Sequence, residues 1–233
     1  MKYDILLFDA DNTLFDFDAS ERLAFDEFAP RFGIAPTNEN YELYRKFNLE
    51  TWAEIEKNSA PKERLLVLRY EKLFKALGVE ADAEEANLVF LRALSTKGVL
   101  YPETIGLLES LKAANCRLYM ITNGVTEVQN GRITATDTEK YFDEIFISEK
   151  VGASKPHKAF FDHVAASVPN FSRDRALVVG DSLTSDVAGA NQYGLDCVWF
   201  NPNGKQLPSD LNVKYIAKTL SSVASVILNS ERP

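Results

Sequence analysis

Two aspartates one residue apart, Asp9 and Asp11, follow an apolar run near the start of this 233-residue chain. The run Ile5–Phe8 predicts a strand buried on both faces, as in a parallel sheet. Side chains at i and i+2 of a strand point to one side, so both carboxylates converge at the strand's carboxyl end, where open α/β sheets bind ligands. Two close negative charges need a cation or a proton between them. The pair therefore predicts a divalent metal site and a possible carboxylate nucleophile.

A second polar segment, Thr122-Asn123-Gly124, follows the apolar residues 116–121. The Thr122 hydroxyl and the following backbone amides could seat a phosphate at the start of a helix, and Gly124 allows the backbone to approach a ligand closely. An ordinary strand-to-helix turn, with Thr122 or Asn123 as the N-cap, would explain the same residues.

A third segment contains Lys155 and Pro156. Proline is common at the first helical position, so we expect a helix over residues 156–168. Lys155 would then lie at a helix start, where the macrodipole disfavours a cation unless a bound dianion offsets it. A solvated loop lysine is the alternative interpretation.

A fourth segment contains Asp181 and Asp186. Asp181 ends the apolar run 176–179, as Asp9 ends the first strand, and it could complete an oxygen-rich Mg²⁺ shell with Asp9 and water. Helix capping is the alternative, and it suits Asp186 better than Asp181.

Two patterns of secondary structure must position these groups. Between about residues 20 and 96, aromatic and leucine residues recur at helical spacing and predict four helices. From residue 100 onward, expected helices at 103–114, 125–136, 156–168, 185–193 and 221–228 alternate with expected strands at 116–121, 145–147, 176–179, 197–200 and 215–217. Such alternation predicts an α/β fold with a doubly wound, Rossmann-like parallel sheet. We therefore expect a core of residues 1–15 and 98–233, with residues 16–97 inserted as an all-helical cap.

The composition excludes several classes of partner and cellular location for this protein. A net charge of −8 argues against a partner that is a nucleic-acid polymer or an anionic membrane. No stretch approaches the roughly 20 apolar residues of a transmembrane helix, and the start of the chain does not resemble a signal peptide. The two cysteines, Cys116 and Cys197, fall in predicted strands, which favours reduced core residues in a cytoplasmic protein. The oligomeric state is not predicted.

The four segments together resemble the motifs of the haloacid dehalogenase-like phosphohydrolases. The matching residues are Asp9-x-Asp11-x-Thr13, Thr122, Lys155-Pro156 and Gly180-Asp181-x4-Asp186. Within that superfamily, residues 8–17 and Thr122-Asn123-Gly124 resemble the pyrimidine 5′-nucleotidase branch.

The resemblance implies a mechanism. Asp9 would be the nucleophile that forms an aspartyl-phosphate, and Asp11 would protonate the leaving alcohol and then activate water. Thr122 and Lys155 would hold the transferring phosphoryl group, with Asn123 and Gly124 in the same phosphate seat. Mg²⁺ would bind Asp9, the backbone carbonyl of Asp11 and Asp181, with Asp186 supporting the shell. Because a carbon–halogen bond needs no acid, Asp11 argues against dehalogenation.

The expected substrate is a small phosphate ester, most specifically a pyrimidine or non-canonical nucleoside 5′-monophosphate. Four aromatic residues of the inserted segment are candidates to stack on a base, with core packing as the alternative for each: Phe17, Tyr44, Phe47 and Trp52. The alternative substrates are phosphoglycolate or a sugar phosphate. A sugar-phosphate mutase, which uses the same acid/base residue, is the alternative reaction.

Overall fold

The computed structural model describes residues 1–57 and 59–230, and these contain one six-stranded sheet whose strand pairs are all parallel. The strand order is β3-β2-β1-β4-β5-β6. The strands are β1 (Ile5–Phe8), β2 (Arg117–Thr122), β3 (Glu144–Ile147), β4 (Ala176–Gly180), β5 (Asp196–Phe200) and β6 (Tyr215–Ala217). The predicted doubly wound α/β fold is confirmed.

The central position of β1 brings the polar segments together. Phe8, its last residue, is in register with Met120 of β2 on one side and with Val179 of β4 on the other. The three strands therefore end at nearly the same level, and the loops that follow them share one edge of the sheet.

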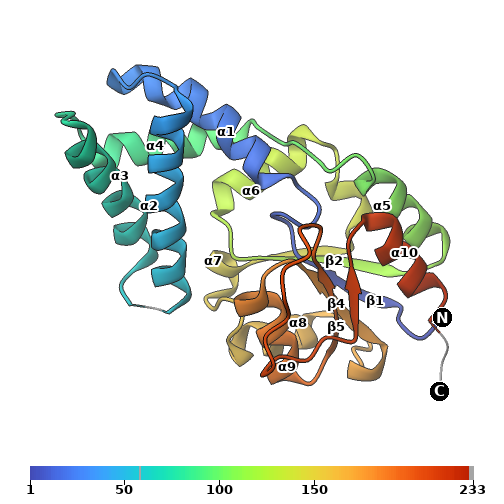
Figure 1. The fold of residues 1–233 in the computed structure, drawn as a ribbon. Helices are drawn as coiled ribbons and strands as arrows, with labels where there is room; N and C mark the ends of the chain where they lie inside the picture. The colour runs from blue at the N-terminus through green and yellow to red at the C-terminus, as the bar shows by residue number, and fades with distance from the viewer. Residues whose placement is uncertain (58, 231–233) are drawn as a thin grey trace.

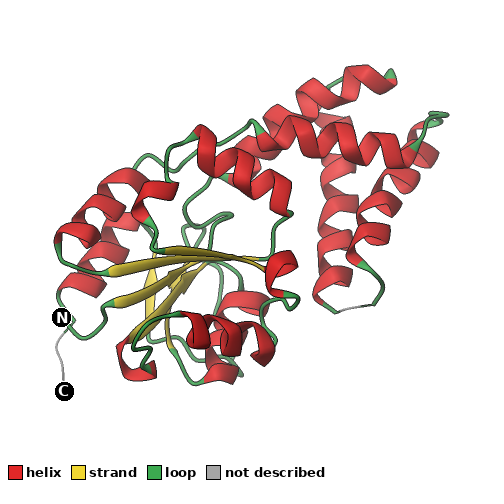
Figure 2. Cartoon of the chain, turned by 180° about the vertical axis from the view of Figure 1, so that it is seen from behind, coloured by secondary structure: helices red, strands yellow, loops and turns green. Residues whose placement is uncertain are grey.

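Helices cover both faces of the sheet (Figures 1 and 2). Alternate residues of β1 enter different cores, because side chains of a strand alternate between faces: Leu6 and Phe8 in one, Ile5 and Leu7 in the other. The first face is packed by α5 (Thr104–Ala113), α6 (Thr126–Ala135) and α10 (Leu220–Leu228). The second is packed by α8 (Lys158–Ser167) and α9 (Ala188–Tyr193).

The segment inserted after β1 forms a group of helices beside the sheet (Figure 1). They are α1 (Phe17–Phe28), α2 (Asn38–Glu56), α3 (Lys62–Leu77) and α4 (Ala83–Ser95). Their aromatic side chains form a separate core in which the ring of Tyr44 contacts those of Phe25, Tyr70 and Phe90. We call these four helices the cap. The cap packs against the core mainly through α4 and α6.

The chain enters and leaves the cap at one place. The Asp16 N–H donates to the carbonyl of Val99 at 2.9 Å, and the Tyr101 N–H donates to the carbonyl of Leu14 at 3.1 Å. Between these bonds, Phe15 forms an antiparallel bridge with residue 100. The two connections to the cap therefore run as a short paired ribbon.

Short elements complete the description. They are the 3₁₀ turns Ala29–Phe32, Glu139–Tyr141 and Arg173–Arg175, the helix α7 (Ser148–Val151) and the π-helical turn Leu183–Val187. Both cysteines are buried and unpaired. Among the described helices, none combines the length and the apolar character needed to cross a membrane.

Candidate active site

Asp9 lies directly after β1 and is 7 % exposed. Its backbone N–H donates to the carbonyl of Val179 at 2.9 Å, which extends the sheet pairing by one residue. One carboxylate oxygen accepts from the Thr13 hydroxyl at 3.0 Å, and the other accepts from Lys155 Nζ at 2.7 Å. The carboxylate of Asp9 is thus held in one orientation at the carboxyl edge of the sheet.

Lys155 is buried, and its ammonium group donates three hydrogen bonds. The acceptors are carboxylate oxygens of Asp9 and Asp186, both at 2.7 Å, and the carbonyl of Ile121 at 2.8 Å. Burial alone would lower the pKa of Lys155, but the negative charges of Asp186 and Asp9 outweigh it and raise the pKa. Lys155 is therefore a fixed positive charge beside Asp9.

The local setting of Lys155 differs from the expected helix start. Helix α8 begins at Lys158 rather than at residue 156, so Lys155 and Pro156 lie in the preceding loop. That loop is fixed by Asn123, whose amide accepts from the Lys155 N–H at 2.9 Å and donates to its carbonyl at 2.8 Å. The predicted helix start at residue 156 is therefore wrong, and the carboxylate partners of Lys155 explain its burial instead.

Three acidic side chains converge at the same edge. Asp9, Asp181 and Asp186 each offer an oxygen, and these atoms all lie within 4.8 Å of one another. Burial and the charge of Asp186 raise the pKa of Asp9 to about 7, and burial and the charge of Asp9 raise the pKa of Asp181 to about 8. A hard divalent cation prefers such oxygen ligands and would relieve their repulsion. The residues present therefore fit a divalent metal site.

Asp186 reaches this cluster because of Gly180 at the end of β4. A Cβ on Gly180 would lie 2.2 Å from a carboxylate oxygen of Asp186, so the close approach requires glycine. The same oxygen of Asp186 accepts from the Ser182 N–H at 3.1 Å. The π-helical turn Leu183–Val187 thus folds Asp186 back over the strand that delivers Asp181.

Thr122 and Gly124 form the second side of the site. The Thr122 hydroxyl oxygen accepts from the Gly124 N–H at 3.0 Å and from Gln129 Nε2 at 2.8 Å. The Asn123 side chain, by contrast, is engaged with the backbone of Lys155. Asn123 therefore joins the two loops through its amide, and both ends of that amide are already engaged with the backbone of Lys155.

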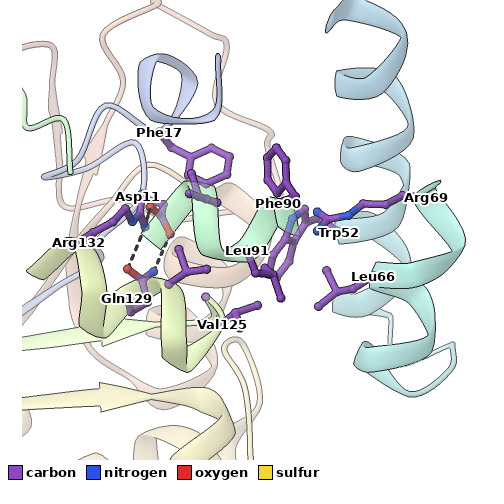
Figure 3. Close-up of a pocket in the computed structure, with 13 residues that line it drawn as sticks. Asp11, Phe17, Trp52, Leu66, Arg69, Phe90, Leu91, Val125, Gln129 and Arg132 are labelled. Atoms are coloured by element: carbon purple, nitrogen blue, oxygen red, sulfur yellow. Dashed lines mark hydrogen bonds and ion pairs between the residues drawn. The ribbon is translucent and has the colours of Figure 1, made fainter. Parts of the chain in front are cut away.

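Asp11 is oriented by two residues that the sequence interpretation did not identify. One of its oxygens accepts from Gln129 Nε2 at 2.7 Å, and the other forms a short ion pair with Arg132 (Figure 3). Gln129 and Arg132 lie three residues apart on α6 and are fully buried. Their i,i+3 spacing on the helix after Thr122 places both on one face, and this spacing is the available sequence signal.

A cleft of about 290 Å³ opens between this site and the cap. Asp9, Asp11, Thr122, Lys155, Asp181 and Asp186 all line it, so the structure brings together every charged residue selected from the motifs. The cap side of the cleft adds polar residues that were not anticipated: Asp18, Glu21, Arg45, Asn48 and Glu56.

Two of the four candidate aromatic residues face the space above Asp11. Phe17 and Trp52 line both the cleft and the adjoining pocket shown in Figure 3, where Arg69 also points inward from α3. Tyr44 is instead fully buried in the aromatic core of the cap, and Phe47 packs against that core. Tyr44 and Phe47 are therefore not placed to stack on a base, and core packing accounts for both.

Comparison with known proteins adds a family assignment. Residues 3–194 match the model of the haloacid dehalogenase-like hydrolase family. The chain is 34 % identical over 203 residues to the pyrimidine 5′-nucleotidase PynA of Streptococcus pneumoniae, covering 87 % of this chain and 86 % of that protein. It is 30 % identical over 230 residues to the pyrimidine 5′-nucleotidase YjjG of Escherichia coli, covering 97 % and 99 % of the two chains.

A solved structure gives the same result for the fold. The HAD-hydrolase YfnB of Bacillus subtilis, crystallised bound to magnesium, is 31 % identical to this chain and superimposes with a TM-score of 0.92. The superposition covers 97 % of this chain and 99 % of that one, so the similarity includes the cap.

Proposed function

The chain belongs to the haloacid dehalogenase-like hydrolase family, and we propose that it is a Mg²⁺-dependent 5′-nucleotidase for pyrimidine or non-canonical nucleoside monophosphates. The observation that carries the phosphatase part is the position of Asp9, whose carboxylate lies beside Lys155 and two further aspartates on the floor of the cleft. The nucleotidase part is supported by the similarity to two pyrimidine 5′-nucleotidases and by the aromatic residues above Asp11.

In the first half of the proposed reaction, a carboxylate oxygen of Asp9 attacks phosphorus. A bond forms between that oxygen and phosphorus, and the bond to the leaving alcohol oxygen breaks. Lys155 reduces the repulsion between the carboxylate and the phosphate dianion, since its charge lies 2.7 Å from Asp9. A bound Mg²⁺, held by Asp9 and Asp181 with Asp186, would supply further positive charge for the transferring group.

Asp11 is proposed to move the protons. It donates one to the leaving alcohol as the phosphorus–oxygen bond breaks, and it then accepts one from the water that attacks the aspartyl-phosphate. The second attack releases inorganic phosphate and regenerates the Asp9 carboxylate. Asp11 lines the same cleft as Asp9 and adjoins the pocket with Phe17 and Trp52, where the leaving group would lie.

The cap side of the cleft is proposed to receive the nucleoside. Phe17 and Trp52 offer aromatic faces on which a base can stack. Asn48 and Arg69 carry amide and guanidinium groups toward the same region, and they are linked by a short hydrogen bond between Arg69 Nη1 and Asn48 Oδ1. An aromatic slot next to polar groups suits a flat heterocycle with carbonyl and N–H edges.

The proposal is tested by measuring phosphate release from a panel of esters in the presence of Mg²⁺. We expect uridine and thymidine monophosphates to exceed a hexose phosphate and phosphoglycolate in kcat/KM, and Asp9→Asn to abolish release from all of them. If phosphoglycolate or the hexose phosphate is the best substrate, the nucleotidase assignment is wrong, while the phosphatase assignment stands. If Asp9→Asn retains turnover, the assignment of Asp9 as nucleophile is wrong.

A further inference from the structure

Gln129 occupies an unusual position between the phosphate side and the acid side of the site. Its side chain is fully buried on α6, and all its amide groups are engaged. Nε2 donates to Asp11 at 2.7 Å and to the Thr122 hydroxyl at 2.8 Å, while Oε1 accepts from Arg132 Nη2 at 2.9 Å. A single amide therefore links three residues of the site, and Figure 3 shows the two of them that line the adjoining pocket, Asp11 and Arg132.

The chemistry of these partners fixes which way the amide points. The opposite orientation would place Oε1 against the carboxylate of Asp11 and Nε2 against the guanidinium of Arg132. The contact with Arg132 would be repulsive whatever the protonation state of Asp11, because a guanidinium only donates hydrogen bonds. The observed orientation is thus the one in which Gln129 donates toward Asp11 and Thr122.

This orientation has a consequence for the hydroxyl group of Thr122. A hydroxyl carries one hydrogen to donate and two lone pairs to accept with. Both lone pairs are occupied, one by the Gly124 N–H at 3.0 Å and one by Gln129. Within the described residues no acceptor is bonded to the hydrogen of Thr122, whose side chain lines the cleft beside Asp9. That hydrogen is left to donate to a ligand in the cleft.

We propose that Gln129 is a positioning residue that makes the Thr122 hydroxyl an obligate donor to the phosphoryl group and holds Asp11 in place for the leaving group. The inference rests on the proposed phosphatase function. It adds a residue outside the four motifs. The amide of this residue donates to both Asp11 and Thr122 and so decides how each of them can hydrogen-bond to a ligand.

Arg132 fixes the orientation of the Gln129 amide by donating to its oxygen. It is fully buried, and its guanidinium carbon lies 4.9 Å from the centre of the Phe15 ring. The ring and the ion pair with Asp11 restrict the guanidinium to one place, where it donates to Gln129 Oε1. The amide is therefore prevented from rotating by a charged group that has no acceptor of its own.

Gly124 also depends on this arrangement. A Cβ at position 124 would lie 2.2 Å from Gln129 Nε2, so any larger residue would displace the amide from Thr122. The glycine of the phosphate loop therefore serves the close approach of Gln129 as well as the approach of a ligand.

The test uses the full-length, Mg²⁺-loaded enzyme and p-nitrophenyl phosphate, whose leaving group needs little protonation. We expect Gln129→Leu and Thr122→Val each to lower kcat/KM by roughly 100-fold, the usual cost of losing one donor to a transition-state oxygen. The double variant should be no worse than Thr122→Val alone, because Gln129 acts on this substrate through Thr122. Additive losses, or a Gln129→Leu enzyme with wild-type kcat/KM, would overturn the proposal.

A second variant, Gln129→Glu, keeps the shape of the side chain and reverses its hydrogen bonding. A carboxylate at this position would accept the Thr122 hydrogen and repel Asp11. We expect it to lower kcat/KM at least as much as Gln129→Leu and to weaken inhibition by orthovanadate, a mimic of the transferring group. Wild-type activity or wild-type vanadate inhibition in Gln129→Glu would contradict the inference, whether or not Gln129→Leu folds.

Two controls separate this result from other failures. Asn130→Leu changes the neighbouring, exposed residue of α6 and should leave activity unchanged. Asp9→Asn tests the phosphatase function itself. If the wild type hydrolyses the aryl ester, Asp9→Asn does not, and both Gln129 variants retain full kcat/KM, then only the role of Gln129 is refuted.

Discussion

Lys155 Nζ lies 2.7 Å from a carboxylate oxygen of Asp9, and both side chains are at least nine-tenths removed from solvent. A buried ion pair of this kind holds a positive charge next to the proposed nucleophile before any substrate binds, so the lysine does not have to move into place. The same ammonium also holds Asp186 at 2.7 Å, so its loss would leave two buried carboxylates without a cation from the protein.

We therefore expect Lys155→Met to lower kcat/KM for an aryl phosphate by roughly 10²- to 10³-fold, because a charge that stabilises the transferring group is lost. The metal-free variant should also unfold at a lower temperature than the metal-free wild type. Steady-state kinetics and thermal unfolding measure both effects. Lys158→Met, which removes an exposed lysine three residues away, is the matched control; similar losses in the two variants would contradict the role of Lys155.

Removal of metal should stop turnover. The cluster of Asp9, Asp181 and Asp186 concentrates negative charge where a phosphate dianion must also bind. We expect EDTA to abolish phosphate release and Mg²⁺ to restore it. Mg²⁺ should also raise the unfolding temperature of the wild type, as any ligand of the folded state does, but not that of Asp181→Asn. Full activity in metal-free buffer would exclude the proposed cofactor.

Trp52 gives a prediction about substrate choice. A stacked base contributes about 1–3 kcal/mol, which corresponds to a preference of roughly 5- to 150-fold for a nucleotide over a plain sugar phosphate. We expect Trp52→Ala to reduce this preference while sparing hydrolysis of p-nitrophenyl phosphate. Phe47→Ala is the control, since Phe47 packs against the cap core and does not line the cleft. If Trp52→Ala lowers kcat/KM equally for the nucleotide and for p-nitrophenyl phosphate, Trp52 does not act by stacking on the base.

Glu21 predicts a pH dependence of stability in the cap. This buried carboxyl accepts from Asn48 at 2.5 Å and from Tyr41 at 3.2 Å, and burial raises its pKa to about 7 from 4.5. Because the folded state holds the proton more tightly, the wild type should lose stability as the pH rises from about 4.5 to about 7.

We expect Glu21→Gln to reduce the difference in the free energy of unfolding between pH 5 and pH 8 by roughly a few kcal/mol, as measured by urea unfolding at the two pH values. The glutamine can still accept from Asn48 and can donate to the Tyr41 oxygen. Glu42→Gln, at an exposed position of α2, should keep the wild-type dependence. Equal pH dependence in wild type and Glu21→Gln would show that Glu21 does not titrate in this range.

The sequence predicted the sheet and the charged residues at its edge because strong local signals mark them. Ile5–Phe8 is apolar at every position, as a strand buried on both faces must be, and Asp9 follows it directly. The same reasoning applied to the run that ends at Asp181. Polar residues that interrupt the carboxyl end of a buried strand stand out in a sequence.

Gln129 and Arg132 could not be identified in this way. Polar residues spaced three apart on a helix usually mark its solvent-exposed face, and the contacts of Gln129 and Arg132 with Asp11 are known only once α6 is placed beside the loop that follows β1. The sequence also could not distinguish the roles of Tyr44 and Trp52, because both belong to α2. Which side of α2 faces the cap core and which faces the cleft is known only once the neighbouring helices are placed.

The paired ribbon at Asp16 and Val99 bears on how the inserted segment could change during evolution. The whole cap leaves and re-enters through two adjacent backbone positions, joined by a hydrogen bond of 2.9 Å. Anything spliced between them, from a tight turn to a larger domain, would leave every strand pairing of the sheet unchanged. The sheet edge that holds Asp9, Lys155 and Asp181 can therefore stay the same while the cap above it is exchanged, so proteins of this architecture can differ in the ligand that they accept and still share one arrangement of charged residues.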